Sequence, residues 1–240
     1  MKIAAYQFAV TGSIKQNMKT IESAIEQAAA EGVELLIFPE CALTGYPPHD
    51  IEHVTDICYD DVESCFERLQ QMIDEKCIHI IVGAVTKEQK KYYNSAVLLA
   101  PGKEKCAYHK RVLWGFDKEN FHAGNRAGVF QIAGHKIGVR ICCEVRDSEQ
   151  FLELKETQTE LNVILFYDVT AVEDLDRYEM LRAQVRARAS ECGSYLLGVD
   201  TICPNQSAPT LLVDASGHVL AEAERNKEMM LRYNLEQIAG

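Results

Sequence analysis

The sequence predicts an α/β protein in which two layers of sheet are covered by helices. In the first half of the chain, short apolar runs alternate with amphipathic helical patterns, which is the order of elements in α/β folds. In the second half, stretches such as residues 209–223 are typical of hairpins. No linker, low-complexity run or internal repeat interrupts the 240 residues, so we expect one domain over residues 1–240.

The first half carries clear helix and strand patterns. Ser13 and Gln16 form a capping-box pattern ahead of an apolar helical face that ends at Gly32. Residues 33–38, VELLIF, form a continuous apolar run, which is typical of a buried strand. We expect strands at residues 2–10, 33–38, 79–85 and 94–100, and helices at residues 13–32 and 62–73.

Two turns organise the second half. We expect one hairpin to turn at Gly134 and another to turn at Ser216 and Gly217. The other expected elements are helices at residues 146–157 and 174–191 and strands at residues 162–167, 195–202 and 228–235.

The composition argues against several classes of partner. The net charge is −11, from 25 basic and 36 acidic residues, and no basic stripe is present, which disfavours nucleic acid and anionic membranes. No apolar run approaches the ~20 residues of a membrane span. The first residues lack the apolar core of a signal peptide, so we expect a cytoplasmic protein. Nine cysteines without CxxC spacing predict reduced thiols rather than cysteine-bound zinc.

Two adjacent cysteines, Cys142 and Cys143, end a strand-like stretch and precede the helix expected from residue 146. Free backbone amides at the start of that helix favour a thiolate and stabilise an oxyanion. Because strand residues alternate sides, we expect only one of the pair to face a pocket. The alternative is that both are packing residues. We expect packing roles for the other seven: Cys41, Cys58, Cys65, Cys77, Cys106, Cys192 and Cys203.

A nucleophilic thiol needs a base or a cation, and two other strand ends offer them. Glu40 follows the apolar run LLIF and Pro39, and Lys110 ends the strand-like stretch CAYH. Considered alone, Glu40 could equally be a helix N-cap or part of a loop ion pair, and Lys110 could be an ordinary solvent-exposed lysine. Together, a carboxylate, an ammonium and a thiol at three strand ends can form a site for nucleophilic catalysis.

The segments LLIFPECALTGYPP, YHK with DKENFHAG, and IGVRICCEVRDSE resemble the three signature blocks of the nitrilase, or carbon–nitrogen hydrolase, superfamily. The resemblance extends over most of the chain and implies a four-layer α-β-β-α sandwich, often paired into dimers. It implies that Glu40 is the general base, that Lys110 is the catalytic lysine and that Cys142 is the nucleophile. A second, supporting glutamate of the family falls on Glu119, where it would orient the lysine or the substrate.

The implied activity is hydrolysis of a non-peptide C–N bond in a small amide or nitrile, with no metal or organic cofactor, by a homodimer or higher homo-oligomer. Several motifs look most like the glutaminase part of glutamine-dependent NAD synthetases, which hints at an ω-amide. Cys143, Asp147 with Ser148, and residues 166–170 depart from the family pattern, and the last two segments are expected at the pocket wall. These changes motivate an alternative, a catalytically inactive scaffold or small-molecule binder.

Three histidines are further candidates for a functional role. His49 and His53 are four residues apart, which can suit a metal, but two prolines precede them and no third ligand is evident. His109 lies beside Lys110, and alternation along a strand predicts that it faces away from the site.

Overall fold

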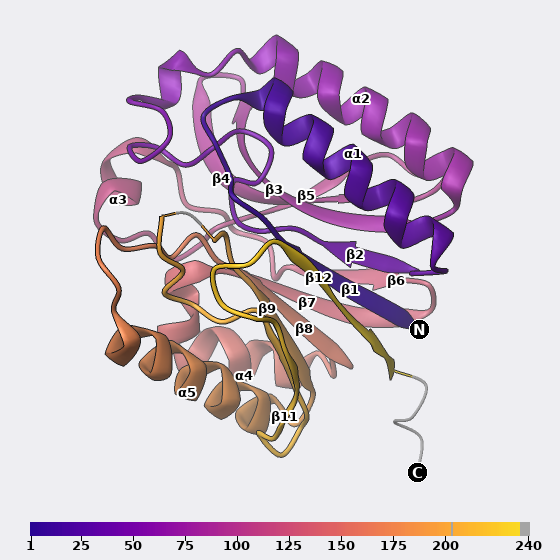
Figure 1. Ribbon diagram of the computed structural model, residues 1–240, viewed down its shortest axis with the longest axis vertical. Helices are drawn as coiled ribbons and strands as arrows, with labels where there is room; N and C mark the ends of the chain where they lie inside the picture. The colour runs from indigo at the N-terminus through magenta and orange to yellow at the C-terminus, as the bar shows by residue number, and fades with distance from the viewer. Residues whose placement is uncertain (203, 236–240) are drawn as a thin grey trace.

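The computed structural model describes residues 1–202 and 204–235. Two six-stranded sheets face each other, with a pair of helices on the outer face of each (Figure 1). Helices α1 and α2 cover one sheet, and α4 and α5 cover the other. The predicted α-β-β-α sandwich is therefore confirmed. Within the described residues, no helix is long and apolar enough to cross a membrane.

The first sheet has the strand order β12-β1-β2-β3-β4-β5. Its strands β1, β2 and β3 are parallel, β12 and β4 pair antiparallel with β1 and β3, and β5 pairs antiparallel with β4. The strands are β1 (Lys2–Gln7), β2 (Leu35–Ile37), β3 (His79–Glu88), β4 (Lys91–Leu99), β5 (Cys106–His109) and β12 (Met229–Asn234).

The second sheet has the order β11-β10-β9-β8-β7-β6 and the same plan. Strands β7, β8 and β9 are parallel, while β6, β10 and β11 run antiparallel to their neighbours. The strands are β6 (Val129–Ile132), β7 (His135–Ile141), β8 (Leu161–Leu165), β9 (Tyr195–Val199), β10 (Leu211–Val213) and β11 (Val219–Glu222).

The helices begin at polar caps that the sequence displays. The Ser13 hydroxyl accepts a hydrogen bond from the Gln16 amide at 3.3 Å, and Asp147 and Asp174 cap α4 and α5 in the same way. The helices are α1 (Ile14–Ala30), α2 (Tyr59–Lys76), α3 (Phe116–Asn120), α4 (Ser148–Glu156) and α5 (Leu175–Cys192), with 3-10 turns at Val54–Asp56 and Cys142–Arg146.

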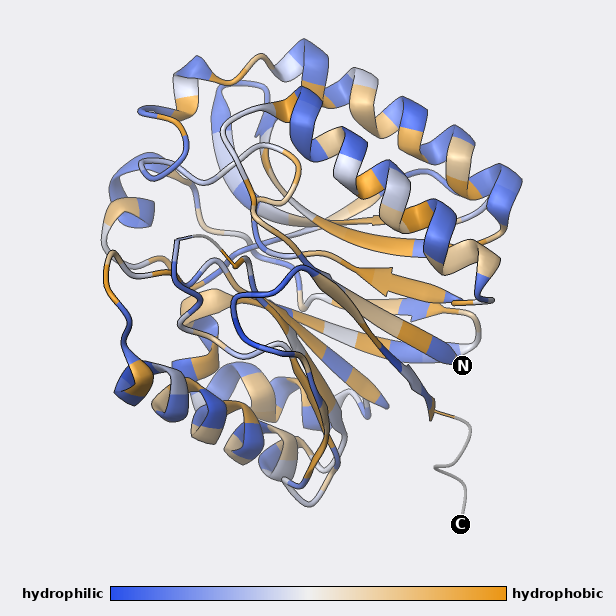
Figure 2. Cartoon of the chain, in the orientation of Figure 1, coloured by the Kyte–Doolittle hydropathy of each residue, from blue (hydrophilic) through white to orange (hydrophobic). Residues whose placement is uncertain are grey.

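Three apolar layers hold the sandwich together. One lies between the first sheet and α1 with α2, one lies between the sheets, and one lies between the second sheet and α4 with α5. Figure 2 shows the apolar strands in the middle and polar faces on the outer helices. In the central layer, Ile37 and Ile81 of the first sheet share a buried cluster with Val139 and Val163 of the second.

Two of the cysteines expected to pack are exposed. Cys58 is the residue that precedes α2, and Cys77 ends the same helix with a left-handed backbone, φ 55°. The prediction was wrong for both because helix ends face solvent even where the helix body is buried. The prediction for Cys203 lies outside the described residues.

Candidate active site

Glu40 lies in a buried loop directly after β2, and its side chain is 1% exposed. Its Oε1 accepts a hydrogen bond from Asn94 Nδ2 at 2.6 Å, and its Oε2 accepts one from the Tyr167 amide at 2.8 Å. Gly83 of β3 makes room for this loop, because a Cβ there would come within 2.7 Å of the Glu40 Cα. The carboxylate is thus held by both sheets of the sandwich.

Lys110 follows β5 and is equally buried, 2% exposed. Its Nζ lies 2.9 Å from Glu40 Oε1 and 2.7 Å from Asp117 Oδ2. The second Asp117 oxygen accepts a hydrogen bond from the Tyr46 hydroxyl at 2.6 Å. One ammonium therefore bridges two buried carboxylates.

Glu119 does not join this cluster. It was expected to orient either the lysine or the substrate, but it is exposed on the short helix α3, and the hydrogen bond to Lys110 is made by Asp117. Successive helical positions are about 100° apart, so residues 117 and 119 face nearly opposite directions. Both acidic residues are visible in the sequence, but which of them faces Lys110 depends on the direction in which each points from the helix.

Cys142 comes directly after β7 and has a left-handed backbone, φ 48°. It begins a 3-10 turn, so the chain leaves the extended conformation at this residue. As a result Cys142 and Cys143 both line one cavity, together with Lys110 and Asp117. The expectation that only one of the two thiols faces the pocket was wrong, because the alternation of a strand no longer applies in the turn.

Glu144, which the sequence reasoning missed, fixes this turn to the lysine loop. It is fully buried, and its Oε2 accepts a hydrogen bond from the Ile141 amide at 2.7 Å. Its Oε1 accepts from the Tyr108 hydroxyl and from the Arg111 amide, both at 2.7 Å. A buried acid in a strand-to-turn segment of mixed charge gives no distinctive pattern in the sequence.

The cavity has a volume of about 330 Å³ and opens near the carboxyl ends of the central strands. As predicted, residues 167–170 of the departing segment form part of its wall, whereas Asp147 caps α4 and does not line it. On this wall Asp168 forms a two-point ion pair with Arg177, at 2.6 and 2.5 Å. The rings of Tyr46 and Tyr167 stack beside it, 5.0 Å apart.

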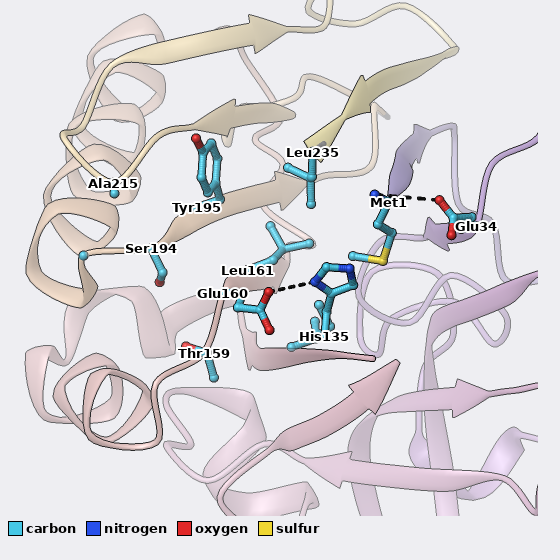
Figure 3. Close-up of a pocket in the computed structure, with 12 residues that line it drawn as sticks. Met1, Glu34, His135, Thr159, Glu160, Leu161, Ser194, Tyr195, Ala215 and Leu235 are labelled. Atoms are coloured by element: carbon cyan, nitrogen blue, oxygen red, sulfur yellow. Dashed lines mark hydrogen bonds and ion pairs between the residues drawn. The ribbon is translucent and has the colours of Figure 1, made fainter. Parts of the chain in front are cut away.

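A larger cavity, about 790 Å³, lies near the amino ends of β7, β8 and β9. Figure 3 shows Met1 paired with Glu34 and His135 paired with Glu160 in its lining. Its lining includes no cysteine or lysine. It therefore lacks the thiol and the ammonium that the sequence predicts for the site, and the smaller cavity is the candidate active site.

Burial sets the protonation of the site. Desolvation raises the pKa of the Glu40 carboxyl, and Asp117 adds to that shift while Lys110 opposes it. Burial acts to lower the pKa of Lys110, but the acidic groups around it, Glu40 first, raise it well above its usual value. Burial also raises the pKa of the Cys142 thiol. Lys110 is therefore an ammonium, and Cys142 needs a base to become a nucleophile.

The two histidine neighbourhoods differ. His109 faces away from the cavity, with its ring nitrogens 2.7 Å from Ser95 Oγ and 2.9 Å from Glu88 Oε1. His49 lies at the cavity wall, with its ring 5.8 Å from that of Tyr167. No cluster of three or more potential metal ligands occurs in the described part of the chain.

A family model described as "Carbon-nitrogen hydrolase" matches residues 2–237. The chain belongs to this family. The match confirms the predicted family. The fold also resembles that of the NitN amidase from Nesterenkonia sp. AN1, with a TM-score of 0.85 and 21% identity over 98% of this chain and 92% of that one.

Relatives of this chain include enzymes of different lengths. It is 34% identical to a glutamine-dependent NAD(+) synthetase of Synechocystis sp., over 78% of this chain but 33% of the relative. It is 24% identical to an (R)-stereoselective amidase of Pseudomonas sp., over 99% of this chain and 86% of the relative. The chain thus spans only about a third of the first relative's length.

Proposed function

We propose that this protein hydrolyses the C–N bond of a small amide through a thioester on Cys142. The observation that carries the proposal is the shared cavity: the Cys142 thiol lines it beside a Lys110 ammonium that is hydrogen-bonded to Glu40. These are the nucleophile, the cation and the base that acyl transfer needs.

In the proposed reaction, the Cys142 sulfur attacks the amide carbon while Glu40 takes the thiol proton. Lys110 and a backbone amide near Cys143 hold the negative oxygen of the tetrahedral intermediate. The C–N bond then breaks, and the leaving nitrogen takes the proton from Glu40 and departs as ammonia or an amine. Glu40 next removes a proton from water, which attacks the thioester, and the thiol is restored as the acid leaves.

Two arginines on the cavity wall favour a substrate that carries a carboxylate. Arg146 lines the cavity and is exposed, and within the described residues no ion pair or hydrogen bond engages it. Arg177 uses its Nε and one terminal nitrogen on Asp168, which leaves guanidinium hydrogens for a ligand. An anionic group distant from the amide would meet these two arginines, so we propose an ω-amide of a small carboxylic acid.

The first test compares Cys142→Ala with Cys143→Ala, assayed for ammonia released from glutamine and from monoamides of short dicarboxylic acids. We expect Cys142→Ala to reduce the rate by at least about a thousandfold and Cys143→Ala to leave most of it, because only Cys142 is assigned as nucleophile. Activity that survives Cys142→Ala contradicts the assignment. If wild type releases no ammonia from any amide, the inactive binding protein becomes the better interpretation.

The second test addresses the carboxylate. Arg146→Gln is expected to raise KM about tenfold or more for a dicarboxylic monoamide, because a charged hydrogen bond is lost, and to leave a neutral amide of equal length unchanged. Arg68→Gln, an exposed arginine on α2, serves as the matched control. Equal effects on the charged and neutral amides would refute the role of Arg146.

A further inference from the structure

Two adjacent thiols share the active-site cavity. Cys142 and Cys143 are both partly exposed, and both line the cavity together with Lys110. The left-handed backbone at Cys142 ends the strand, so the side-to-side alternation of a strand no longer separates the two residues. No other described cysteine lines this cavity.

Cys143 is held only weakly where it lies. Its thiol donates one hydrogen bond, to the Val112 carbonyl oxygen at 3.2 Å, and sulfur is a weak donor. The proposed reaction gives this thiol no part. Cys143 is therefore a second thiol, adjacent in the chain to the nucleophile and unused by the reaction. In redox-sensitive proteins, a neighbouring thiol of this kind reacts with the oxidised cysteine to form a disulfide.

We propose that Cys142 and Cys143 form a reversible oxidative modification site, in which a hydroperoxide converts the pair into a vicinal disulfide that blocks the nucleophile. The inference rests on the nucleophilic Cys142 of the proposed function. Its product is a covalent change in the chain, however, so it can be measured without any amide substrate.

The oxidation proceeds in two steps with hydrogen peroxide as the oxidant. The Cys142 sulfur, its proton taken by Glu40, attacks one peroxide oxygen; an S–O bond forms, the O–O bond breaks, and the leaving hydroxide takes the proton as water. The Cys143 sulfur then attacks the Cys142 sulfenic acid; the S–S bond forms, the S–O bond breaks, and a second water leaves. Two thiols lose two electrons and one peroxide becomes two waters.

Local geometry makes this disulfide easy to reverse. Neighbouring Cα atoms across a trans peptide are about 3.8 Å apart, shorter than the separation of most disulfides, about 4.4 to 6.8 Å. A disulfide in that ring is strained and more readily reduced. Its expected role is therefore protection of Cys142 from irreversible oxidation rather than structural cross-linking.

The sequence allows a direct test by peptide mass. Trypsin cleaves after Arg140 and Arg146, which isolates ICCEVR, a peptide that contains both cysteines and no other. The folded protein is treated with hydrogen peroxide, alkylated, unfolded and digested. We expect an unalkylated ICCEVR about 2 Da lighter than the dithiol peptide, and its disappearance when dithiothreitol precedes alkylation.

Cys143→Ser is the matched control, because a hydroxyl can still donate to the Val112 carbonyl oxygen. In this variant we expect no light peptide, and instead Cys142 with two or three added oxygens that dithiothreitol does not remove. A wild-type peptide with an oxygenated Cys142 and an alkylated Cys143, or one unchanged by excess peroxide, overturns the proposal. A light peptide in a protein that hydrolyses no amide would support this inference while the proposed function failed.

Discussion

At the scale of single residues, the site depends on how one ammonium is shared. Lys110 lies between Glu40 and Asp117, and each carboxylate has a second neutral donor, Asn94 or Tyr46. These donors satisfy lone pairs that burial would otherwise leave unpaired. The sequence and the family resemblance pointed to Glu40 and Lys110, but neither pointed to the residues that orient them.

Asp117 is expected to matter and Glu119 is not. Asp117→Asn removes one of the two charges that hold Lys110, so we expect kcat to fall by about tenfold to a hundredfold. Glu119→Gln, two residues away and exposed, is the control and should keep the wild-type rate. Steady-state kinetics on one amide measures both, and equal losses would show that Asp117 has no special role.

The pH dependence is expected to report Glu40. Its carboxylate must be ionised to accept the thiol proton, so kcat/KM should rise with pH through a pKa above that of an ordinary glutamate, because burial raises the pKa. The Asn94 hydrogen bond stabilises the ionised form and lowers this pKa. Asn94→Ala should therefore shift the acidic limb of the profile to higher pH. A limb that stays fixed or moves to lower pH contradicts the assignment.

At the scale of elements, strand ends position the site and turns aim its side chains. Glu40 follows β2, Lys110 follows β5 and Cys142 follows β7, so three strands bring three distant positions together. Periodicity and capping residues predicted the long helices α1, α2, α4 and α5 but not α3, and an apolar run marked the buried β2. The positive φ at Cys142 could not be predicted, because it occurs at a residue other than glycine.

Gly83 gives an element-level test. A Cβ at this position of β3 would lie 2.2 Å from the Pro39 carbonyl oxygen and 2.5 Å from the Cys41 amide nitrogen, so Gly83→Ala must displace the loop that holds Glu40. We expect urea denaturation to show a loss of about 1–3 kcal/mol in the free energy of unfolding, with a loss of activity.

Gly198→Ala is the matched control in β9, where the nearest atoms are 3.2 Å from the new Cβ. We expect a smaller loss of stability and near-normal activity. If Gly83→Ala had the same stability and activity as this control, the close approach of β3 to the Glu40 loop would not be needed for function.

At the scale of the whole molecule, the sandwich places its chemistry at one end. Lys110, Cys142 and Arg146 line the smaller cavity, and Glu40 is hydrogen-bonded to Lys110. The larger cavity, at the amino ends of the second sheet's parallel strands (Figure 3), includes no cysteine or lysine in its lining. The layer order was predictable because three signature blocks occur in sequence at suitable spacing. The composition of the cavity wall was not, since Asp168 and Arg177 meet only in the folded chain.

The most direct test of the account is to capture the acyl group during turnover. Wild-type protein is mixed with an excess of an amide that it hydrolyses, and the reaction is quenched in acid within the first turnovers. The protein is then digested, and the masses of ICCEVR and of its fragments are measured to locate the modified cysteine. We predict an acyl group on Cys142 that hydroxylamine removes and that Cys143→Ser retains. The same experiment is run with Glu40→Gln, in which deacylation is slowed. Two results would contradict the central claim that Cys142, Glu40 and Lys110 act together: turnover by Glu40→Gln with an unmodified peptide, or an acyl group on Cys143 alone.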